Sequence, residues 1–559
     1  MRVFLACPLT QYLETDEETG EVRLNATMRH FVVSLECALH DAGHTTFLAH
    51  RHECFGAKLR AGNICTPFDL LEMQRADCVV AMPSSSYGVH IELGWSAALN
   101  KPIILLNNQT NTTPLLSGLS SLGQHTTIPI PPDILSRPEE FSAIHNQICC
   151  ALDHVTLIPR KPSCAFLTTG FGFGPVSKAV TIAEEIRRSA PEVSLHYFGA
   201  RIDYDYAIKS AVFDRIFRID VDDNDTLQEL VPLLQQYDGV IDVLNLDLLT
   251  QWAPDNVPLY FVDSLSWMWP TTLLGISNAR VYFVQNYLMQ ADRLARTKSS
   301  TTIKAIPPII KSPGASESKP ARKLGSLLVN FSGSFNPFIE EEIYERYVDV
   351  LSEAVLDSVG DKFNDIIFAC NARLAERLHD RLGKCELIRT GHYGHDDFLQ
   401  LMATSELVLS TPGITTTLEA LSSGSPLRYL LPQNYSQALI SEKYSTMLGE
   451  RMTMAFSRFG SQFVVQNDLP EQEGVQLVSS YLRTILTDHR DSIISMISDL
   501  LSIPPTQGVL QFQSDMRNEF LRSGQRVIAD YCLNDIRMAA AAQDRSLVER
   551  VTAPNPLRT

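Results

Sequence analysis

Residues 76–95 contain the side chains whose chemistry can be named most directly. An apolar run, Cys78–Met82, leads into a small polar loop with Ser84–Ser86 and Gly88, and then into a helical pattern that contains Glu92. This order predicts a strand, a loop and a helix. Loop hydroxyls, backbone N–H groups and the positive end of a helix can bind a phosphate. An ionised carboxylate beside a sugar's anomeric carbon could then act as a nucleophile.

The same stretch also has a purely structural interpretation. Ser84–Ser86 could cap the helix, and Glu92, expected in or just before its first turn, could complement the helix dipole. In that position we expect the carboxyl group of Glu92 to stay ionised.

The surrounding sequence resembles the nucleoside 2-deoxyribosyltransferase superfamily, and within it the nucleotide N-hydrolases, including cytidine monophosphate hydrolases. The resemblance rests on residues 2–9, 76–77 and 88–95 and covers roughly residues 1–150. It implies that Glu92 attacks the anomeric carbon and that Asp77 helps the base to depart. It also implies that the loop after the first strand, with Pro8, contacts base and sugar.

The resemblance also indicates the substrate and a partner. Where deoxyribosyltransferases carry an aspartate for the 5′-hydroxyl, this chain has Ser86, which accepts a 5′-phosphate without charge repulsion. With Ser84 and Gly88, it would bind a nucleoside monophosphate. In the family a neighbouring subunit completes the site near residues 117–121, which implies a dimer with Ser117 as a phosphate contact. An ordinary surface turn is the alternative.

Other polar residues near this region have less definite roles. The segment His50–Gly56, after the second predicted strand, could form a wall of the same cleft, but its histidines do not have the spacing of a zinc site. We therefore expect no metal. Asp69 could support the site or lie at the surface.

Composition limits the classes of partner. The formal charge of -17 disfavours nonspecific binding to nucleic acid or to an anionic membrane. The chain has no run of about 18 apolar residues and begins in a predicted strand without a charged leader. We therefore expect a cytoplasmic protein without a membrane partner. The 11 cysteines form no CxxC pair and are expected to be reduced core residues.

A second strand, loop and helix pattern, at 407–420, resembles the donor lobe of GT-B glycosyltransferases that use nucleotide sugars. The resemblance implies that Gly413–Thr417 bind the diphosphate, that Glu419 binds the ribose, and that Asn434 and Gln437 bind the donor sugar. A lobe kept only for structure is the alternative. The predicted donor-binding residues are Gly172, Gly174, Ser332, Gly333, Gly413, Thr415, Thr416, Thr417, Glu419, Arg428, Asn434 and Gln437.

The residues between these two regions predict an acceptor lobe. The glycine-rich loop 170–175 could approach a ligand closely, but the acidic residue of a dinucleotide fold is missing, because 196–200 reads HYFGA. NAD is therefore disfavoured. Asp263 and Trp267 could hold and stack a flat acceptor, or could close an apolar surface between lobes.

The 559 residues suggest about three domains. Prolines at 159–162 and the linker 312–320 separate them. We predict an α/β protein: a doubly wound, parallel-sheet, deoxyribosyltransferase-like domain at 1–158, a GT-B acceptor lobe at 163–312, and a GT-B donor lobe with the C-terminal helices at 322–559.

Residues 163–559 resemble cytosylglucuronic acid synthases of nucleoside antibiotic biosynthesis. The two resemblances imply a bifunctional enzyme that releases cytosine from CMP and joins it to glucuronic acid from a UDP-sugar co-substrate, without another cofactor. Arg428 or Lys178 could bind the glucuronate carboxylate. Two alternatives remain: a glycosyltransferase whose N-terminal domain only binds a nucleotide, and an N-hydrolase for another nucleotide coupled to a different glycosyl transfer.

Overall fold

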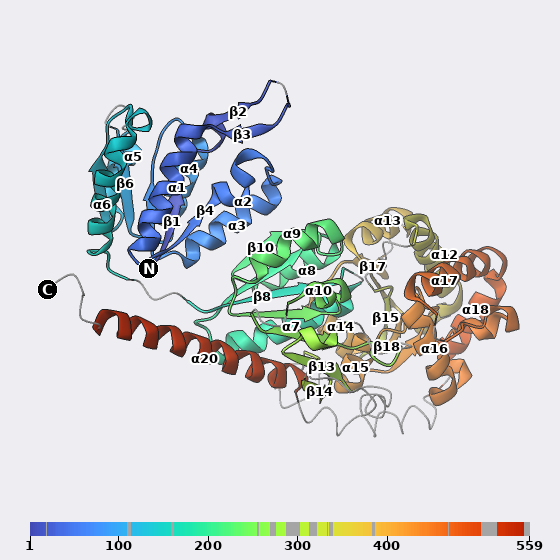
Figure 1. Ribbon diagram of the computed structural model, residues 1–559. Helices are drawn as coiled ribbons and strands as arrows, with labels where there is room; N and C mark the ends of the chain where they lie inside the picture. The colour runs from blue at the N-terminus through green and yellow to red at the C-terminus, as the bar shows by residue number, and fades with distance from the viewer. Residues whose placement is uncertain are drawn as a thin grey trace. The chain divides into compact units, whose positions relative to one another are not determined.

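The computed structural model describes most of the chain. The residues outside the description are 18, 109–112, 158–160, 171, 254–256, 269–274, 287–301, 312–320, 333, 335–338, 383–385, 468, 503, 505–522 and 553–559, together with the side chains of 302 and 539–552. The chain divides into two compact units, Met1–Lys161 and Pro162–Thr559. Each unit is built on parallel sheets (Figure 1), which confirms the predicted α/β class.

The first unit is a five-stranded parallel sheet in the order β4-β1-β5-β6-β7. Its strands are β1 Arg2–Ala6, β4 Thr45–Leu48, β5 Cys78–Ala81, β6 Ile103–Asn107 and β7 His125–Pro129, and its hairpin is β2 Leu13–Thr15 with β3 Val22–Leu24. Its helices are α1 Ala26–Asp41, α2 Ala49–His52, α3 Gly62–Arg75, α4 Tyr87–Ala98, α5 Pro114–Gly118 and α6 Phe141–Leu152. The order reverses direction between β1 and β5, so ligands are expected beyond their carboxyl ends.

Alternating side chains of these strands point to opposite faces, and each face is covered by helices. Val3 and Leu5 of β1 pack in one core with Phe31 of α1 and Ile144 of α6. Asn25 starts α1, because its side chain accepts the Met28 N–H at 2.9 Å. The buried sheet therefore gives the loops at its carboxyl edge a rigid support.

The second unit contains two further sheets. The first has the order β10-β9-β8-β11-β12-β13-β14. Its strands are β8 Ser163–Thr168, β9 Ser194–Gly199, β10 Arg215–Arg218, β11 Gly239–Val243, β12 Leu259–Asp263, β13 Val281–Gln285 and β14 Thr302–Ile306, with helices α7 Phe173–Ser189, α8 Ile202–Ser210, α9 Asn224–Leu234 and α10 Leu246–Gln251. We call this part the first lobe.

The other sheet has the order β17-β16-β15-β18-β19, and we call the part built on it the second lobe. Its strands are β15 Lys323–Asn330, β16 Asp365–Ala369, β17 Ile388–Gly391, β18 Ser405–Ser410 and β19 Leu427–Tyr429. Its helices are α12 Glu341–Val359, α13 Ala372–Leu382, α14 His395–Thr404, α15 Ile414–Ser423, α16 Tyr435–Leu448, α17 Glu471–Asp488 and α18 Arg490–Ser502.

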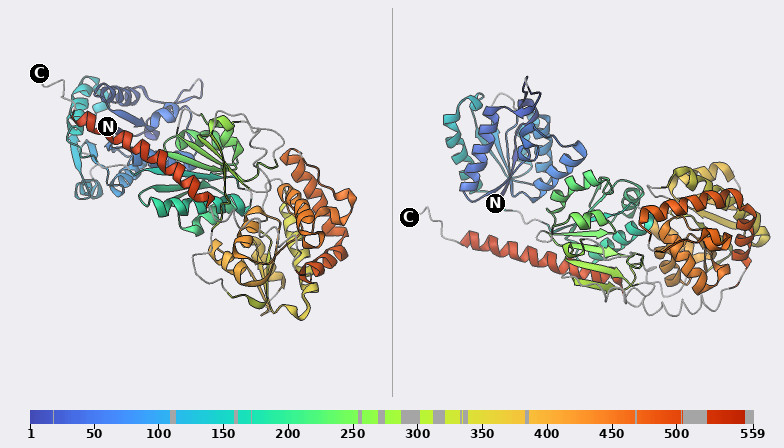
Figure 2. Two further views of the ribbon diagram at one scale, coloured as in Figure 1. Left: turned by 90° about the horizontal axis from the view of Figure 1, so that it is seen from below. Right: turned by 45° about the vertical axis from the view of Figure 1, so that its right-hand side comes forward.

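The last helix, α20 (Gly524–Thr552), returns to the first lobe, where it packs on α7 and β11 (Figure 2). Ile528 and Ala529 are fully buried there, and the Cys532 Sγ lies 3.7 Å from the Cys164 Sγ. The predicted segment 322–559 assigned this helix to the donor lobe. The helix instead covers the first sheet because its apolar residues complete the core around β8. Among the described helices, none is long and apolar enough to cross a membrane.

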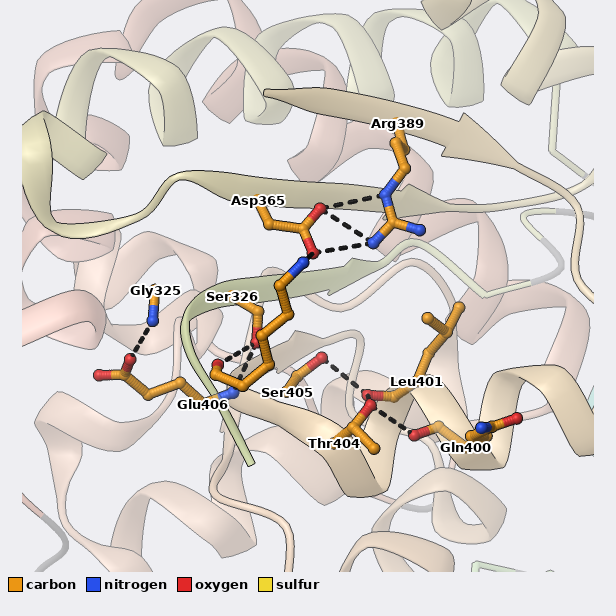
Figure 3. Close-up of polar contacts among 10 residues, drawn as sticks. Gly325, Ser326, Asp365, Arg389, Gln400, Leu401, Thr404, Ser405 and Glu406 are labelled. Atoms are coloured by element: carbon orange, nitrogen blue, oxygen red, sulfur yellow. Dashed lines mark hydrogen bonds and ion pairs between the residues drawn. The ribbon is translucent and has the colours of Figure 1, made fainter. Parts of the chain in front are cut away.

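Charged side chains join the strands at the amino-terminal edge of the second lobe's sheet (Figure 3). Asp365 accepts hydrogen bonds from Lys323 Nζ at 2.8 Å and from Arg389 Nε at 3.0 Å, and Glu406 accepts the Gly325 N–H at 2.6 Å. Burial alone would raise the pKa of Asp365, but the hydrogen bonds from Lys323 and Arg389 outweigh it and lower that pKa. The charged groups at this edge are thus paired within the protein. Ligands are expected at the opposite, carboxyl edge of the sheet.

Candidate functional sites

The first site lies where β1, β4 and β5 of the first unit end. Pro8 follows β1, and its carbonyl oxygen accepts a hydrogen bond from Nε2 of His50 at 3.0 Å. Burial lowers the pKa of His50 to about 4, so its imidazole is neutral near pH 7. Its Nδ1 has no hydrogen-bond partner among the described residues. The segment after β4 is therefore hydrogen-bonded to the loop after β1, and its role as a cleft wall stays a prediction.

Glu92 lies in the second turn of α4, which begins at Tyr87, and not in or before the first turn as expected. Its side chain is half-buried. Burial, and next the charge of Asp69, raise the pKa of Glu92 well above its usual range. One turn deeper in the helix than expected, the carboxyl group is less exposed to solvent and lies beyond the strongest influence of the dipole, and both effects oppose the ionised form that the sequence predicted.

Asp69, on α3, is the carboxyl group that faces Glu92. Burial, together with the charges of Glu53 and Glu72, raises the pKa of Asp69 to about 7, while Arg60 acts in the opposite direction. The negative charge of one carboxyl group disfavours ionisation of a neighbouring one, so a state with one protonated and the other ionised is favoured over two charges. From the sequence we predicted only a supporting or surface role for Asp69, because the spacing of the residues does not show that α3 packs on α4.

Asp77 lies at the other edge of the sheet. It precedes β5, and its Oδ2 accepts the Arg2 N–H at 2.7 Å, next to the start of β1. The four residues of β5 separate it from the loop with Ser84, a distance of about 13 Å along an extended strand. The structure therefore does not bring Asp77 to Glu92, and the role predicted for it is corrected.

The loop after β5 presents its polar groups without using them to cap α4. Ser86 is the N-cap residue, yet its side chain makes no capping hydrogen bond. Its own N–H donates to Ser84 Oγ at 3.3 Å, and Ser85 Oγ donates to Gln11 at 3.1 Å. Gly88 is exposed in the first turn of α4. This geometry favours the anion-binding interpretation over the capping one.

Ser117 lies on the short helix α5, where it is exposed and donates to the Pro114 carbonyl at 3.0 Å. No hydrogen bond among the described residues joins it to the Ser84–Ser86 loop. Among the described residues of this unit, the most exposed large apolar side chains are Tyr87, at 87%, and Leu115, at 86%. The role of Ser117 as a phosphate contact across a dimer interface stays a prediction.

The second site is a cavity of about 590 Å³ between the two lobes of the second unit. Residues from the carboxyl edges of both sheets line it. The predicted donor-binding residues that line the cavity are Gly172, Gly174, Ser332, Gly413, Thr415, Thr416, Glu419, Asn434 and Gln437. Gly333 lies outside the described residues.

The amino end of α15 opens into this cavity. Gly413 is the N-cap residue and supplies no side chain, so the first N–H groups of the helix keep their capacity for an anion. Thr417 is not part of the lining, because its Oγ1 donates to the Gly413 carbonyl at 2.8 Å inside the helix. In α16 the Asn434 Oδ1 accepts the Gln437 N–H at 2.9 Å and caps the helix.

Lys178 of α7 reaches the same place from the first lobe. Its side chain is buried, and its Nζ donates to Thr415 Oγ1 at 2.6 Å and to the Gly174 carbonyl at 3.3 Å. Burial lowers the pKa of Lys178 to about 8, against a smaller opposite effect of Glu419. Within the described part of the chain, no carboxylate forms a salt bridge with it. A buried cation beside an uncapped helix end makes this wall strongly attractive to an anion.

Glu419 is paired with His395 in the cavity wall. His395 Nε2 lies 2.6 Å from Glu419 Oε1. Burial alone would lower the pKa of His395, but the charge and hydrogen bond of Glu419 outweigh burial and raise it. The pair holds the carboxylate of Glu419 in position, which suits the hydroxyl groups of a ribose.

Three predicted residues lie away from the cavity lining. Arg428 is buried in β19, where Nη1 donates to the Leu427 carbonyl at 2.9 Å and burial lowers its pKa to about 10. Asp263 is buried and accepts the Leu265 N–H at 2.6 Å. Tyr282 donates to its other oxygen.

Trp267 packs against the cores of the second lobe, with Lys443 Nζ 4.5 Å from its ring centroid. This position fits the alternative in which Trp267 closes an apolar surface between the lobes. The structure does not place Asp263, Trp267 or Arg428 in the cavity lining, and the ligand roles predicted for them stay predictions. Sequence reasoning also missed Arg201 and Asp222, which line the cavity from the first lobe. Nothing in the sequence pointed to Arg201. Asp222 was marked only by its place as an acidic residue in the loop after β10.

No family model matches the chain, and no curated protein matches it. Among solved structures, the Clostridium botulinum CMP N-glycosidase BcmB aligns with 27% of this chain and 98% of its own at 22% identity, with a TM-score of 0.19. BlsM aligns with 28% of this chain and 96% of its own at 27% identity and a TM-score of 0.22. The glycotransferase of kitacinnamycin aligns with 68% of this chain and 100% of its own at 14% identity and a TM-score of 0.40.

Proposed function

We propose that the chain is a bifunctional enzyme. Its first unit hydrolyses the N-glycosidic bond of a nucleoside 5′-monophosphate, with CMP as the expected substrate, and its second unit transfers glucuronic acid from a UDP-sugar to the released cytosine. The observation that carries the proposal is that each unit places a carboxyl group and an uncapped helix amino end at the carboxyl edge of a parallel sheet: Glu92 with α4, and Glu419 with α15.

In the first reaction Glu92 and Asp69 have complementary roles. In the reactive state Glu92 is the carboxylate and Asp69 is protonated: as Glu92 attacks C1′, the bond from C1′ to the base breaks and Asp69 donates its proton to the departing base. Asp69, now a carboxylate, then takes a proton from water, which displaces Glu92 from C1′. The raised pKa of Asp69, about 7, suits both steps. Ser84 and Ser86 bind the 5′-phosphate in this proposal.

In the second reaction the anionic donor binds at α15. The helix amino end with Thr415 and Thr416 binds the diphosphate, and Glu419 binds the ribose. Lys178 leaves Thr415 and pairs with an anionic group of the donor, a phosphate oxygen or the uronate carboxylate. As the sugar leaves the diphosphate, Lys178 and the helix stabilise the charge that develops on UDP.

Two further properties belong to this proposal. The first unit dimerises, and the exposed Tyr87 and Leu115 are the side chains expected to be covered. Sedimentation equilibrium of the Leu115→Lys variant tests this, because a dimer that depends on the face should dissociate. The enzyme needs no metal or redox cofactor and works in the cytoplasm.

The direct test is incubation with CMP, with and without UDP-glucuronic acid, followed by chromatography and mass spectrometry. We expect cytosine without the donor and a cytosine hexuronate with it. The Glu92→Gln variant should release no cytosine, while it still transfers to added cytosine. Release by Glu92→Gln at the wild-type rate would contradict the hydrolytic mechanism. Failure of the wild type to act on any nucleoside monophosphate would leave the first unit as a binding domain.

A further inference from the structure

The transfer step needs a group that accepts a proton. This inference rests on the proposed function, in which a ring N–H of the base becomes the nucleophile. Four carboxyl side chains line the cavity among the described residues: Asp222, Asp247, Glu419 and Glu471. Glu419 is bonded to His395, Asp247 is exposed on α10, and Glu471 belongs to the second lobe. Asp222 is the half-buried carboxyl group on the first lobe's side.

Asp222 is held in place by the loop after β8. Its Oδ2 accepts the Gly170 N–H at 2.8 Å, and Arg201 Nη1 lies 3.9 Å from the same oxygen. A Cβ on residue 170 would lie 2.7 Å from that Oδ2, so only glycine lets the backbone and the carboxylate approach this closely. Its Oδ1 accepts no hydrogen bond from the described residues, and the side chain is 15% exposed.

We propose that Asp222 is the base of the transferase reaction. The acceptor's ring nitrogen forms a bond to the anomeric carbon, and the bond from that carbon to the UDP oxygen breaks. The N–H proton moves to Oδ1 of Asp222, and UDP leaves with the electron pair of the broken bond. The Gly170 N–H and Arg201 keep Oδ2 fixed, so that Oδ1 faces the acceptor.

The charges around Asp222 suit this role. Burial is the largest effect and raises its pKa to about 6. The Gly170 N–H and Arg201 act against that rise, whereas the carboxylates of Asp220 and Asp203 add to it. Asp242 of β11 is fully buried, and burial, with a smaller effect of the charge of Asp222, raises its pKa. Asp222 is therefore ionised at neutral pH and more basic than an exposed aspartate.

The test uses the full chain with UDP-glucuronic acid and added cytosine. Asp222→Asn keeps an oxygen for the Gly170 N–H, so the fold should be retained, and we expect kcat for transfer to fall about 10²- to 10⁴-fold. The Kd for UDP and cytosine release from CMP should be unchanged. Asp222→Glu should restore part of the rate. The matched control is the exposed neighbour Asp223→Asn, which removes the same charge and preserves the cap of α9.

The pH profile separates a base from a structural residue. The wild-type transfer rate should fall below about pH 6, and this limb should move in Asp222→Glu and disappear in Asp222→Asn. The role of Asp222 would be overturned if Asp222→Asn transferred sugar at a rate within a few-fold of wild type, or if Asp223→Asn lost as much activity as Asp222→Asn. Either result would leave the proposed transferase function standing. If the wild type transfers sugar to no nucleobase, the proposed transferase function fails as well, and the two results are thus distinguished.

Discussion

Replacing Lys178 by Met should make the free protein more stable and the donor site weaker. The ammonium group is buried and hydrogen-bonded only to neutral oxygens, those of Thr415 and Gly174, among the described residues. Burial lowers its pKa from 10.5 to about 8. At about 1.4 kcal/mol for each pH unit, the difference corresponds to about 3 kcal/mol of folding free energy.

The sign of this effect depends on pH. Below pH 8 the lysine is protonated in both the folded and the unfolded chain, and the full cost of burying the charge is present. Between about pH 8 and 10.5 the folded protein releases its proton first, so wild-type stability rises with pH. Lys178→Met should therefore be more stable than wild type by up to about 3 kcal/mol at pH 7, and the gap should shrink by pH 9.5.

Affinity for UDP should change in the opposite direction. A hydrogen bond to a charged group contributes about 1.5–3 kcal/mol, so the Kd for UDP should rise about 10- to 100-fold in Lys178→Met. Calorimetric unfolding at the two pH values and titration calorimetry with UDP measure both effects. Lys58→Met, at an exposed lysine of the first unit, is the control and should change neither. Lower stability of Lys178→Met at pH 7, or unchanged UDP binding, would refute the reasoning.

Three other predictions follow from charged pairs. Asp69→Asn should lower cytosine release from CMP about 10²- to 10⁴-fold and remove the ionisation near pH 7 from the rate profile. Glu419→Gln should raise the KM for the UDP-sugar about tenfold and lower the pKa of His395, measured by NMR titration, because the carboxylate that raises that pKa is lost. Asp365→Asn should destabilise the protein by about 1 kcal/mol at pH 7, and denaturant titrations should show this loss shrinking toward pH 3, since the lowered pKa of Asp365 stabilises the fold only above it.

The sequence predicted those parts of the sites that depend on local order. A strand, a polar loop and a helix were correctly placed around Glu92 and around Glu419, because such patterns are fixed within about twenty residues. Contacts between distant elements were not predictable in this way. Asp77 precedes a strand and Asp69 lies inside a helix, and only the packing of α3 on α4 decides which one faces Glu92. Asp222 and Lys178 meet the cavity for the same reason, through the packing of two lobes.

The return of α20 to the first lobe also affects how the chain folds during synthesis. Cys164 and Cys532, which meet in the core of that lobe, are 368 residues apart. The roughly 220 residues between β14 and α20 take on the order of 10–40 s to translate. For that time β8 and β11 lack the apolar cover that α20 provides, while the first unit can already be folded. The emerging first lobe should therefore be the part of the chain that chaperones bind longest.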